Sequence, residues 1–361
     1  MRPFKSGYSG YRGRRTLNDT LKLIVLILSV LVLLVFIGLM AGQRYLVFTD
    51  DGLRLDLPFS REEEQEPLAP GDISVVVQPS GSVEQGKDSV EEIPETEAAM
   101  AALTLSLDAV LDGSAQQELE KAGANAVVLE MKNSEGRLNW SSNQPLAVQY
   151  GLNSQRADIN ERLRQWNEGT VYTVAQVTCF RDNSIPYQRN DMALRASYGN
   201  WRDELGLRWM NPDSEEARNY LTQLCVELAE LGFDEILLDC CGFPTQGSLE
   251  SIVQNGSYAS GQFEAGIETF LSQIRTALEP YDTALAVRTD RTVLDGQDTV
   301  SGLTAAVLER WVHRLWLTED GQSPALEELA TGAGILEAEK RLVRILPEQS
   351  SWTETDCAFL G

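Results

Sequence analysis

Acidic residues close several apolar runs of this sequence, where the strands of a parallel sheet would end. In "LGFDEILLDCCGFP" the run ends at Asp239, another run ends at Glu130, and Asp290 follows a third. Hydrolysis of a glycosidic bond needs one protonated and one ionised carboxyl group. We therefore predict carboxylate acid and base chemistry, with Asp239 as nucleophile or base, Glu130 as the first candidate for general acid and Asp290 as the second.

Further polar and aromatic residues lie near the same strand ends. We expect Lys132, Asp182, Arg288 and Trp209 to orient the reacting groups or to contact a substrate. Other tryptophans in or near these loops are Trp140, Trp201 and Trp316. Each residue also has a structural interpretation, because Asp suits turns and large aromatic side chains usually pack in cores.

The elements that would position these residues alternate along the chain. The predicted strands are 103–107, 126–131, 171–180, 235–239, 284–288, 314–317, 342–346 and 357–360. The predicted helices are 114–122, 158–169, 214–231, 263–278, 300–312 and 324–340. Alternation of apolar strands with helices predicts a parallel sheet covered on both faces.

A (β/α)8 barrel fits seven or eight strands in residues 99–361. The alternative is a doubly wound open sheet, but no glycine-rich phosphate loop follows any predicted strand. Only "PEQSSWTETD" separates the last two predicted strands, which is too short for a helical crossover. We expect the C-terminal end of the barrel to be truncated or irregular.

Residues 23–41, "LIVLILSVLVLLVFIGLMA", are apolar apart from Ser29. A helix of this length crosses most of a bilayer core of ~30 Å. The alternative, a cleaved signal peptide, usually has an apolar core of only ~7–15 residues. We predict a retained single-pass anchor in the cell membrane. The basic residues 1–22 place the N-terminus in the cytoplasm and the C-terminal domain outside.

The segment 42–98 is acidic and rich in Pro, Gly and Ser. Such a composition cannot bury enough apolar surface to offset its ordering entropy, so it predicts a disordered extracellular linker. Two short apolar pieces, "RYLVFTDDGLRLDLPF" and "DISVVV", could pair locally. Residues 99–361 then form the globular domain.

Charge and composition restrict the partners. The formal net charge of -24 argues against a nucleic-acid partner, which would need clustered Lys and Arg. His313 is the only histidine, and the five cysteines contain no C-x-x-C pair. We therefore expect no metal site and no cofactor.

Three blocks of the sequence are similar to a family of bacterial (β/α)8-barrel proteins whose proposed activity is glycoside hydrolysis. The blocks are "GANAVVLEMKNSEGRLNW", "VYTVAQVTCFRDNSIPYQRNDMAL" and "WRDELGLRWMNPDSEEARNYLTQLCVELAELGFDEILLDCCGFP". The resemblance places Glu130, Lys132 and Asp182 on an Asp, a Lys and an Asp of the family motifs. Asp239 falls on the aspartate that family analogy nominates as catalytic, and Asp290 falls on an aspartate of a weaker block.

This sequence departs from the family pattern beside the nominated aspartate. Where the family reads Asp-Tyr-Ile-Arg, the sequence reads "DCCG", so Gly242 replaces an arginine. We therefore keep two hypotheses. The first is a glycoside hydrolase acting on cell-envelope or environmental polysaccharide, and the second is a degenerate barrel that binds glycan or an envelope protein. A redox role of Cys240 and Cys241 is a third.

Overall fold

The computed structural model describes residues 46–49, 52–55, 99–254, 258–259, 261–347 and 351–360. The chain divides into two units, Met1–Glu91 and Glu92–Gly361. In the first unit β1 (Leu46–Thr49) pairs antiparallel with β2 (Gly52–Leu55), so the first apolar piece of the linker does pair locally.

The predicted basic tail 1–22, membrane anchor 23–41 and the rest of the linker 42–98 lie outside the described residues. No helix among the residues that the structure describes has both the length and the apolar character needed to cross a bilayer.

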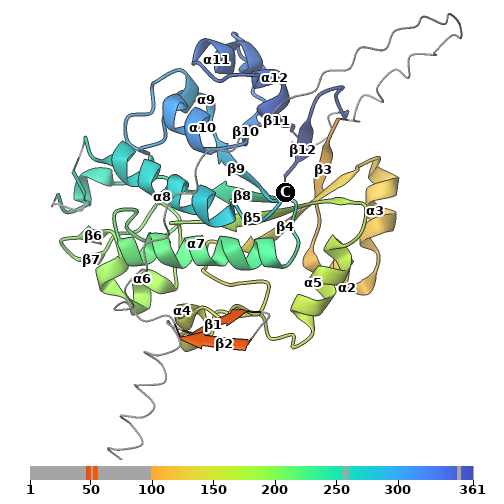
Figure 1. The fold of residues 1–361 in the computed structure, drawn as a ribbon. Coiled ribbons are helices and arrows are strands. Elements are labelled where there is room, and N and C mark those ends of the chain that lie inside the picture. The colour runs from red at the N-terminus through yellow and green to blue at the C-terminus, as the bar shows by residue number, and fades with distance from the viewer. Residues whose placement is uncertain are drawn as a thin grey trace, which may run out of the picture. The chain divides into compact units, whose positions relative to one another are not determined.

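Eight parallel strands close into a barrel in the second unit (Figure 1). They are β3 (Ala101–Thr104), β4 (Ala126–Lys132), β5 (Tyr172–Thr178), β8 (Glu235–Asp239), β9 (Ala284–Thr289), β10 (Arg314–Thr318), β11 (Leu342–Ile345) and β12 (Cys357–Phe359). Neighbouring strands follow the chain order, and β12 pairs with both β11 and β3. The predicted barrel is confirmed.

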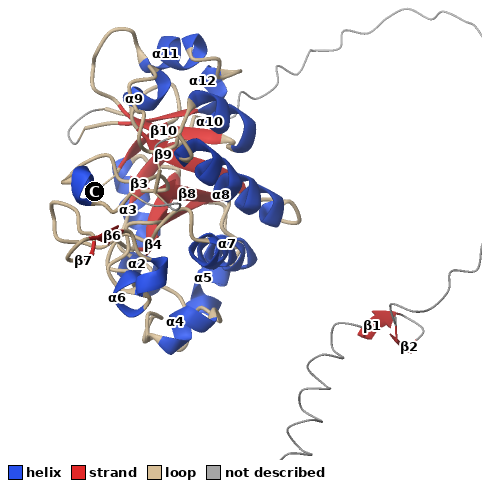
Figure 2. Cartoon of the chain, turned by 90° about the vertical axis from the view of Figure 1, so that its left-hand side faces the viewer, coloured by secondary structure: helices blue, strands red, loops and turns tan. Residues whose placement is uncertain are grey.

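Helices cover the outside of the strands (Figure 2). They are α2 (Leu107–Asp112), α3 (Ala115–Ala122), α4 (Pro145–Gln149), α5 (Ile159–Asn167), α6 (Ile185–Gln188), α7 (Glu215–Glu230), α8 (Phe263–Leu278), α9 (Arg291–Leu294), α10 (Ala305–Trp311), α11 (Leu326–Gly332) and α12 (Ala338–Arg341). The 3₁₀ helices η2 (Asn190–Met192) and η3 (Leu249–Ser251) and the hairpin of β6 (Arg195–Ala196) and β7 (Gly199–Asn200) lie in loops.

Helix α7 shows how local sequence sets an element. Its N-cap Ser214 accepts a hydrogen bond from the backbone N–H of Ala217, and Glu215 and Glu216 lie in the first turn. Acidic residues near this end favour the helix because they interact with its dipole. Gly232 follows the helix with φ of 86°, a left-handed conformation that suits glycine.

The barrel closes although its last crossover is short. Residues 346–347 and 351–356, the described part of the connection from β11 to β12, contain no helix. Trp352 packs there instead: its ring lies 4.4 Å from that of Phe359, and its indole N–H donates to the carbonyl oxygen of Ala122 at 2.7 Å. The expectation of an irregular last unit is confirmed, whereas that of an incomplete barrel is not.

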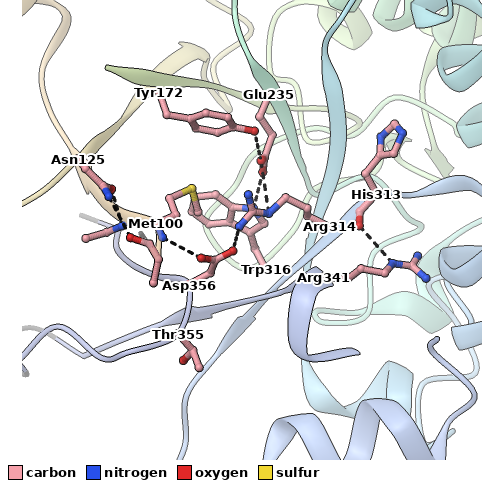
Figure 3. A network of polar contacts seen from close by, with 12 residues as sticks. Met100, Asn125, Tyr172, Glu235, His313, Arg314, Trp316, Arg341, Thr355 and Asp356 are labelled. Atoms are coloured by element: carbon pink, nitrogen blue, oxygen red, sulfur yellow. Dashed lines mark hydrogen bonds and ion pairs between the residues drawn. The ribbon is translucent and has the colours of Figure 1, made fainter. Parts of the chain in front are cut away.

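Apolar side chains of different sizes fill the middle of the barrel, among them Val128, Leu237, Ala286 and Trp316. At the amino ends of the strands, polar residues form a network (Figure 3). Glu235 accepts from the indole N–H of Trp316 at 2.6 Å and from the Tyr172 hydroxyl at 3.0 Å. Arg314 contacts both Glu235 and Asp356.

Candidate active site

A cavity of about 670 Å³ opens at the carboxyl ends of β5, β8, β9 and β10. Its charged lining residues are Arg181, Asp203, Glu204, Asp239, Arg288, Asp290 and Asp298. Catalytic groups of (β/α)8 barrels lie at this end of the strands, because the loops that follow the strands surround it. The structure therefore places four predicted site residues, Asp239, Arg288, Asp290 and Trp209, at one cavity.

Asp239 points into the mouth of the barrel because side chains alternate along β8 and Leu237 points inward. Its Oδ2 accepts hydrogen bonds from Gln176 Nε2 at 3.4 Å and from Arg288 Nη1 at 3.3 Å. Its Oδ1 accepts from the backbone N–H of Cys240 at 2.8 Å. The carboxylate is thus held by three donors while its side chain remains 23% exposed.

The backbone turns sharply after Asp239. Cys240 has φ of 48°, an uncommon conformation for a residue with a side chain. Its carbonyl oxygen accepts from the N–H of Phe180 at 3.1 Å, which holds the turn against the loop after β5. Such strain tends to gather at functional sites.

Gly242, which stands where the family motif has an arginine, packs tightly against the loop that contains Ser301. A Cβ atom at Gly242 would lie 2.7 Å from the carbonyl oxygen of Ser301, so no side chain fits. The guanidinium beside Asp239 comes from Arg288 on the neighbouring strand β9 instead. The mouth therefore keeps an arginine next to the aspartate, supplied by another element.

Side chains alternate along β4, and those of Ala126 and Val128 point into the barrel. Glu130, two positions further along, is on the same face and is exposed at the mouth of the barrel. Its pKa is raised from the ordinary value, first because the surrounding protein removes part of its water and second because of the charge of Asp239. Lys132 opposes this shift. A carboxyl group with a raised pKa beside an ionised carboxylate is the arrangement of a general acid and its partner.

Lys132 and Asp182 do not line the cavity. The two side chains are fully buried and form an ion pair with 2.9 Å between Nζ and Oδ2. Lys132 also donates to the carbonyl oxygens of Thr178 at 2.7 Å and Cys179 at 3.3 Å. Because β4 shifts register between Glu130 and Lys132, the lysine leaves the barrel interior and ties the ends of β4 and β5 together.

Asp290 and Trp209 line the cavity but are also engaged locally. Asp290 caps α9 and accepts from the backbone N–H of Thr292 at 2.8 Å. The Trp209 indole N–H donates to Asp203 Oδ2 at 3.2 Å. Trp140, Trp201 and Trp316 are completely buried core residues.

Sequence reasoning missed three acids of the cavity, Asp203, Glu204 and Asp298. Asp203 reaches it through the long loop after β5, where it pairs with Arg181 at 2.8 Å. Asp298 accepts from the backbone N–H of Ser301 at 2.8 Å and shapes the loop that packs on Gly242. None of these three acids follows an apolar run, so no local sequence pattern could have identified them as site residues.

The adjacent cysteines offer no reactive thiol. All five cysteines are free, and Cys241 is buried. Burial raises the pKa of Cys240 to about 12 and also raises that of Cys241. Thiols with such pKa values stay protonated at neutral pH and are poor nucleophiles.

The chain folds as a closed (β/α)8 barrel with an acidic cavity at the carboxyl ends of its strands. The model of a family described as "Putative glycosyl hydrolase domain" matches residues 101–298, more than half of the 361 residues. The chain belongs to this family. No curated protein matches the sequence.

Several solved structures are similar in fold. A hypothetical protein from Ruminiclostridium thermocellum is 24% identical with a TM-score of 0.45, over 51% of this chain and 96% of its own. The PgaB glycoside hydrolase domain from Bordetella bronchiseptica is 13% identical with a TM-score of 0.47, over 69% of this chain and 84% of its own. Catalytic domain 2 of the group II chitinase from Ostrinia furnacalis is 12% identical with a TM-score of 0.39, over 68% of this chain and 63% of its own.

Proposed function

We propose that this chain is a membrane-anchored glycoside hydrolase that acts outside the cytoplasmic membrane on a cell-envelope or environmental polysaccharide. The observation that carries the proposal is the position of Asp239, held by Arg288, at the cavity of the barrel mouth; Glu130 lies at the end of β4, and the charge of Asp239 helps to raise its pKa. Membership of the glycosyl hydrolase family supports the reaction class. The anchor rests on the apolar segment 23–41 and its basic flank.

The two carboxyl groups would divide the chemistry. Glu130, whose raised pKa keeps its proton to a higher pH than an ordinary glutamate, donates that proton to the glycosidic oxygen as the bond to the leaving sugar breaks. Asp239, held in place by the guanidinium of Arg288, attacks the anomeric carbon or takes a proton from the attacking water. Asp290 is the second candidate for the acid.

The remaining predicted residues would position the site. The buried Lys132–Asp182 pair supports the strand ends that carry Glu130 and the loop after β5. Trp209 offers part of the cavity wall to a sugar ring. No cofactor enters these steps.

A second candidate function is glycan or envelope-protein binding by a barrel that has lost catalysis. The observation that favours it is the engagement of cavity acids in local structure, with Asp203 bound to Arg181 and Asp290 capping α9. In this case the cavity would bind its ligand without cleaving it.

The release of reducing ends from a panel of polysaccharides by the full chain in mild detergent separates the two candidates. We expect hydrolysis of at least one glycan, and a rate at least about 100-fold lower in Asp239→Asn, because acid–base groups contribute about 10²–10⁴-fold. Asp320→Asn, which alters an acid bound to Arg291, is the control and should retain the rate. If the unaltered chain hydrolyses no glycan, and glycan binding is retained in Asp239→Asn, the second candidate function is favoured.

A further inference from the structure

A second cavity, of about 290 Å³, is lined by residues that follow β4 and β5. Arg181 and Trp209, which line the first cavity, pair with each other in a short antiparallel bridge. Asn183 and Arg208, which adjoin this bridge, line the second. A chain-like ligand in the first cavity would therefore pass close to the second.

Two arginines and no carboxylate line this second cavity, although the whole chain has a net charge of -24. Neither Arg137 nor Arg208 lies within ion-pair distance of a carboxylate among the described residues. Arg137 Nη1 donates to the carbonyl oxygen of Gly151 at 2.8 Å, and Arg208 Nη1 donates to Asn183 Oδ1 at 2.7 Å. The other guanidinium nitrogens remain available to an anion.

The charge of Arg208 is poorly compensated by its surroundings. Its pKa is lowered from the ordinary value, first by burial and second by the charge of Arg202. Glu135 opposes this shift, but its carboxylate accepts from Asn183 rather than from an arginine. An anion placed between the arginines would relieve this imbalance.

Aromatic and amide groups complete the cavity. Tyr187, 62% exposed, presents its ring beneath the Arg208 guanidinium, whose Cζ lies 4.7 Å from the ring centre. Tyr150 is a second aromatic lining residue, and Gln188 adds an amide. Aromatic faces with nearby amides suit a sugar ring, whereas a guanidinium fork suits a planar carboxylate.

We propose that the second cavity binds a carboxylate-bearing sugar, so that the glycan acted on contains uronate-type units. This inference rests on the proposed function, because it names the substrate class of that enzyme. Arg208 and Arg137 form ion pairs with the carboxylate of the sugar, and the sugar ring stacks on the side chain of Tyr187. The neutral parts of the glycan continue toward Asp239 across the Arg181–Trp209 bridge.

Calorimetric titration of the full-length Asp239→Asn protein tests the proposal without requiring catalysis. The probes are trisaccharides derived from polygalacturonate, alginate and hyaluronan, each as the free acid and as the neutral methyl ester. We expect at least one acid to bind about tenfold or more tightly than its ester. Equal binding of acid and ester, or no binding by any acid, would overturn the proposal. Competition by inorganic phosphate at the same concentration as the sugar would also overturn it.

Matched variants locate the binding. Arg208→Gln should weaken acid binding about 10- to 100-fold, the loss typical of a hydrogen bond to a charged group. Arg202→Gln removes the same charge from an exposed neighbour outside the cavity and should change binding less than about threefold. If Arg208→Gln fails to fold, the exposed Arg137→Gln replaces it, and unchanged binding in that variant counts against the site. Hydrolysis by the unaltered chain is measured separately, so loss of the proposed function would not be mistaken for loss of this site.

Discussion

The two ends of the barrel use the same kinds of residue for different purposes. Glu235 and Asp239 lie at opposite ends of β8, and each has an arginine from a neighbouring part of the sheet. Glu235 is fully buried and held by Trp316, Tyr172 and Arg314 (Figure 3). Its pKa is raised, chiefly by burial.

At the other end, Asp239 and Arg288 are 23% and 34% exposed and meet at 3.3 Å beside an open cavity. Both carboxylates accept a hydrogen bond on each oxygen, but Glu235 is fully buried whereas Asp239 is partly exposed, so only Asp239 can exchange a protein partner for a substrate. The comparison teaches that access, rather than residue type, separates a structural carboxylate from a candidate catalytic one.

Arg314→Met should have the largest effect, and it concerns stability. It leaves Glu235 and Asp356 without their cation, and removing one partner of a buried ion pair costs about 3–5 kcal/mol. Denaturant unfolding measures the loss. Arg310→Met breaks an exposed pair with Glu268 and should cost less than about 1 kcal/mol. Equal losses in the two variants would show that the amino-end network does not stabilise the barrel.

Arg288→Gln should act on the rate rather than on stability. It removes the guanidinium from Asp239, and a hydrogen bond to a charged group is worth about 1.5–3 kcal/mol, or roughly tenfold or more in rate. Hydrolysis and unfolding are measured on the same preparation. Arg291→Gln, which breaks the pair with Asp320, serves as the control. If Arg288→Gln lost much stability but kept its rate of hydrolysis, Arg288 would have the same structural role at its end of the barrel as Arg314 has at the other end.

The smallest expected effect is a shift in the pKa of Glu130. Carbon NMR of its carboxyl group measures that pKa. In Asp239→Asn the pKa of Glu130 should fall, because the Asp239 charge is one of the two causes that raise it. It should stay above the ordinary value, since burial remains. In the unaltered protein the acid therefore stays protonated to a higher pH. A pKa that does not move would show that the two carboxyl groups do not act together.

Much of the fold followed from local pattern. The predicted strand 235–239 and helix 263–278 coincide with β8 and α8, because apolar runs and capping residues act over a few positions. The helix boundaries were predicted less accurately where loop residues contact distant parts of the chain. The predicted helix 300–312 begins at Ala305, since Ser301 packs against Gly242, and the predicted helix 324–340 divides into α11 and α12.

The sequence by itself determined that Asp239 ends a barrel strand, because alternation and chain order fix which end and which face of β8 it occupies. Only the tertiary structure decided its surroundings. Arg288 contacts Asp239 from the next strand, Gly242 has no room for a side chain, and Asp203 reaches the cavity from the loop after β5. Lys132 lies buried in an ion pair with Asp182 instead of lining the cavity. These outcomes depend on atoms from segments far apart in the chain, whose approach no local pattern records.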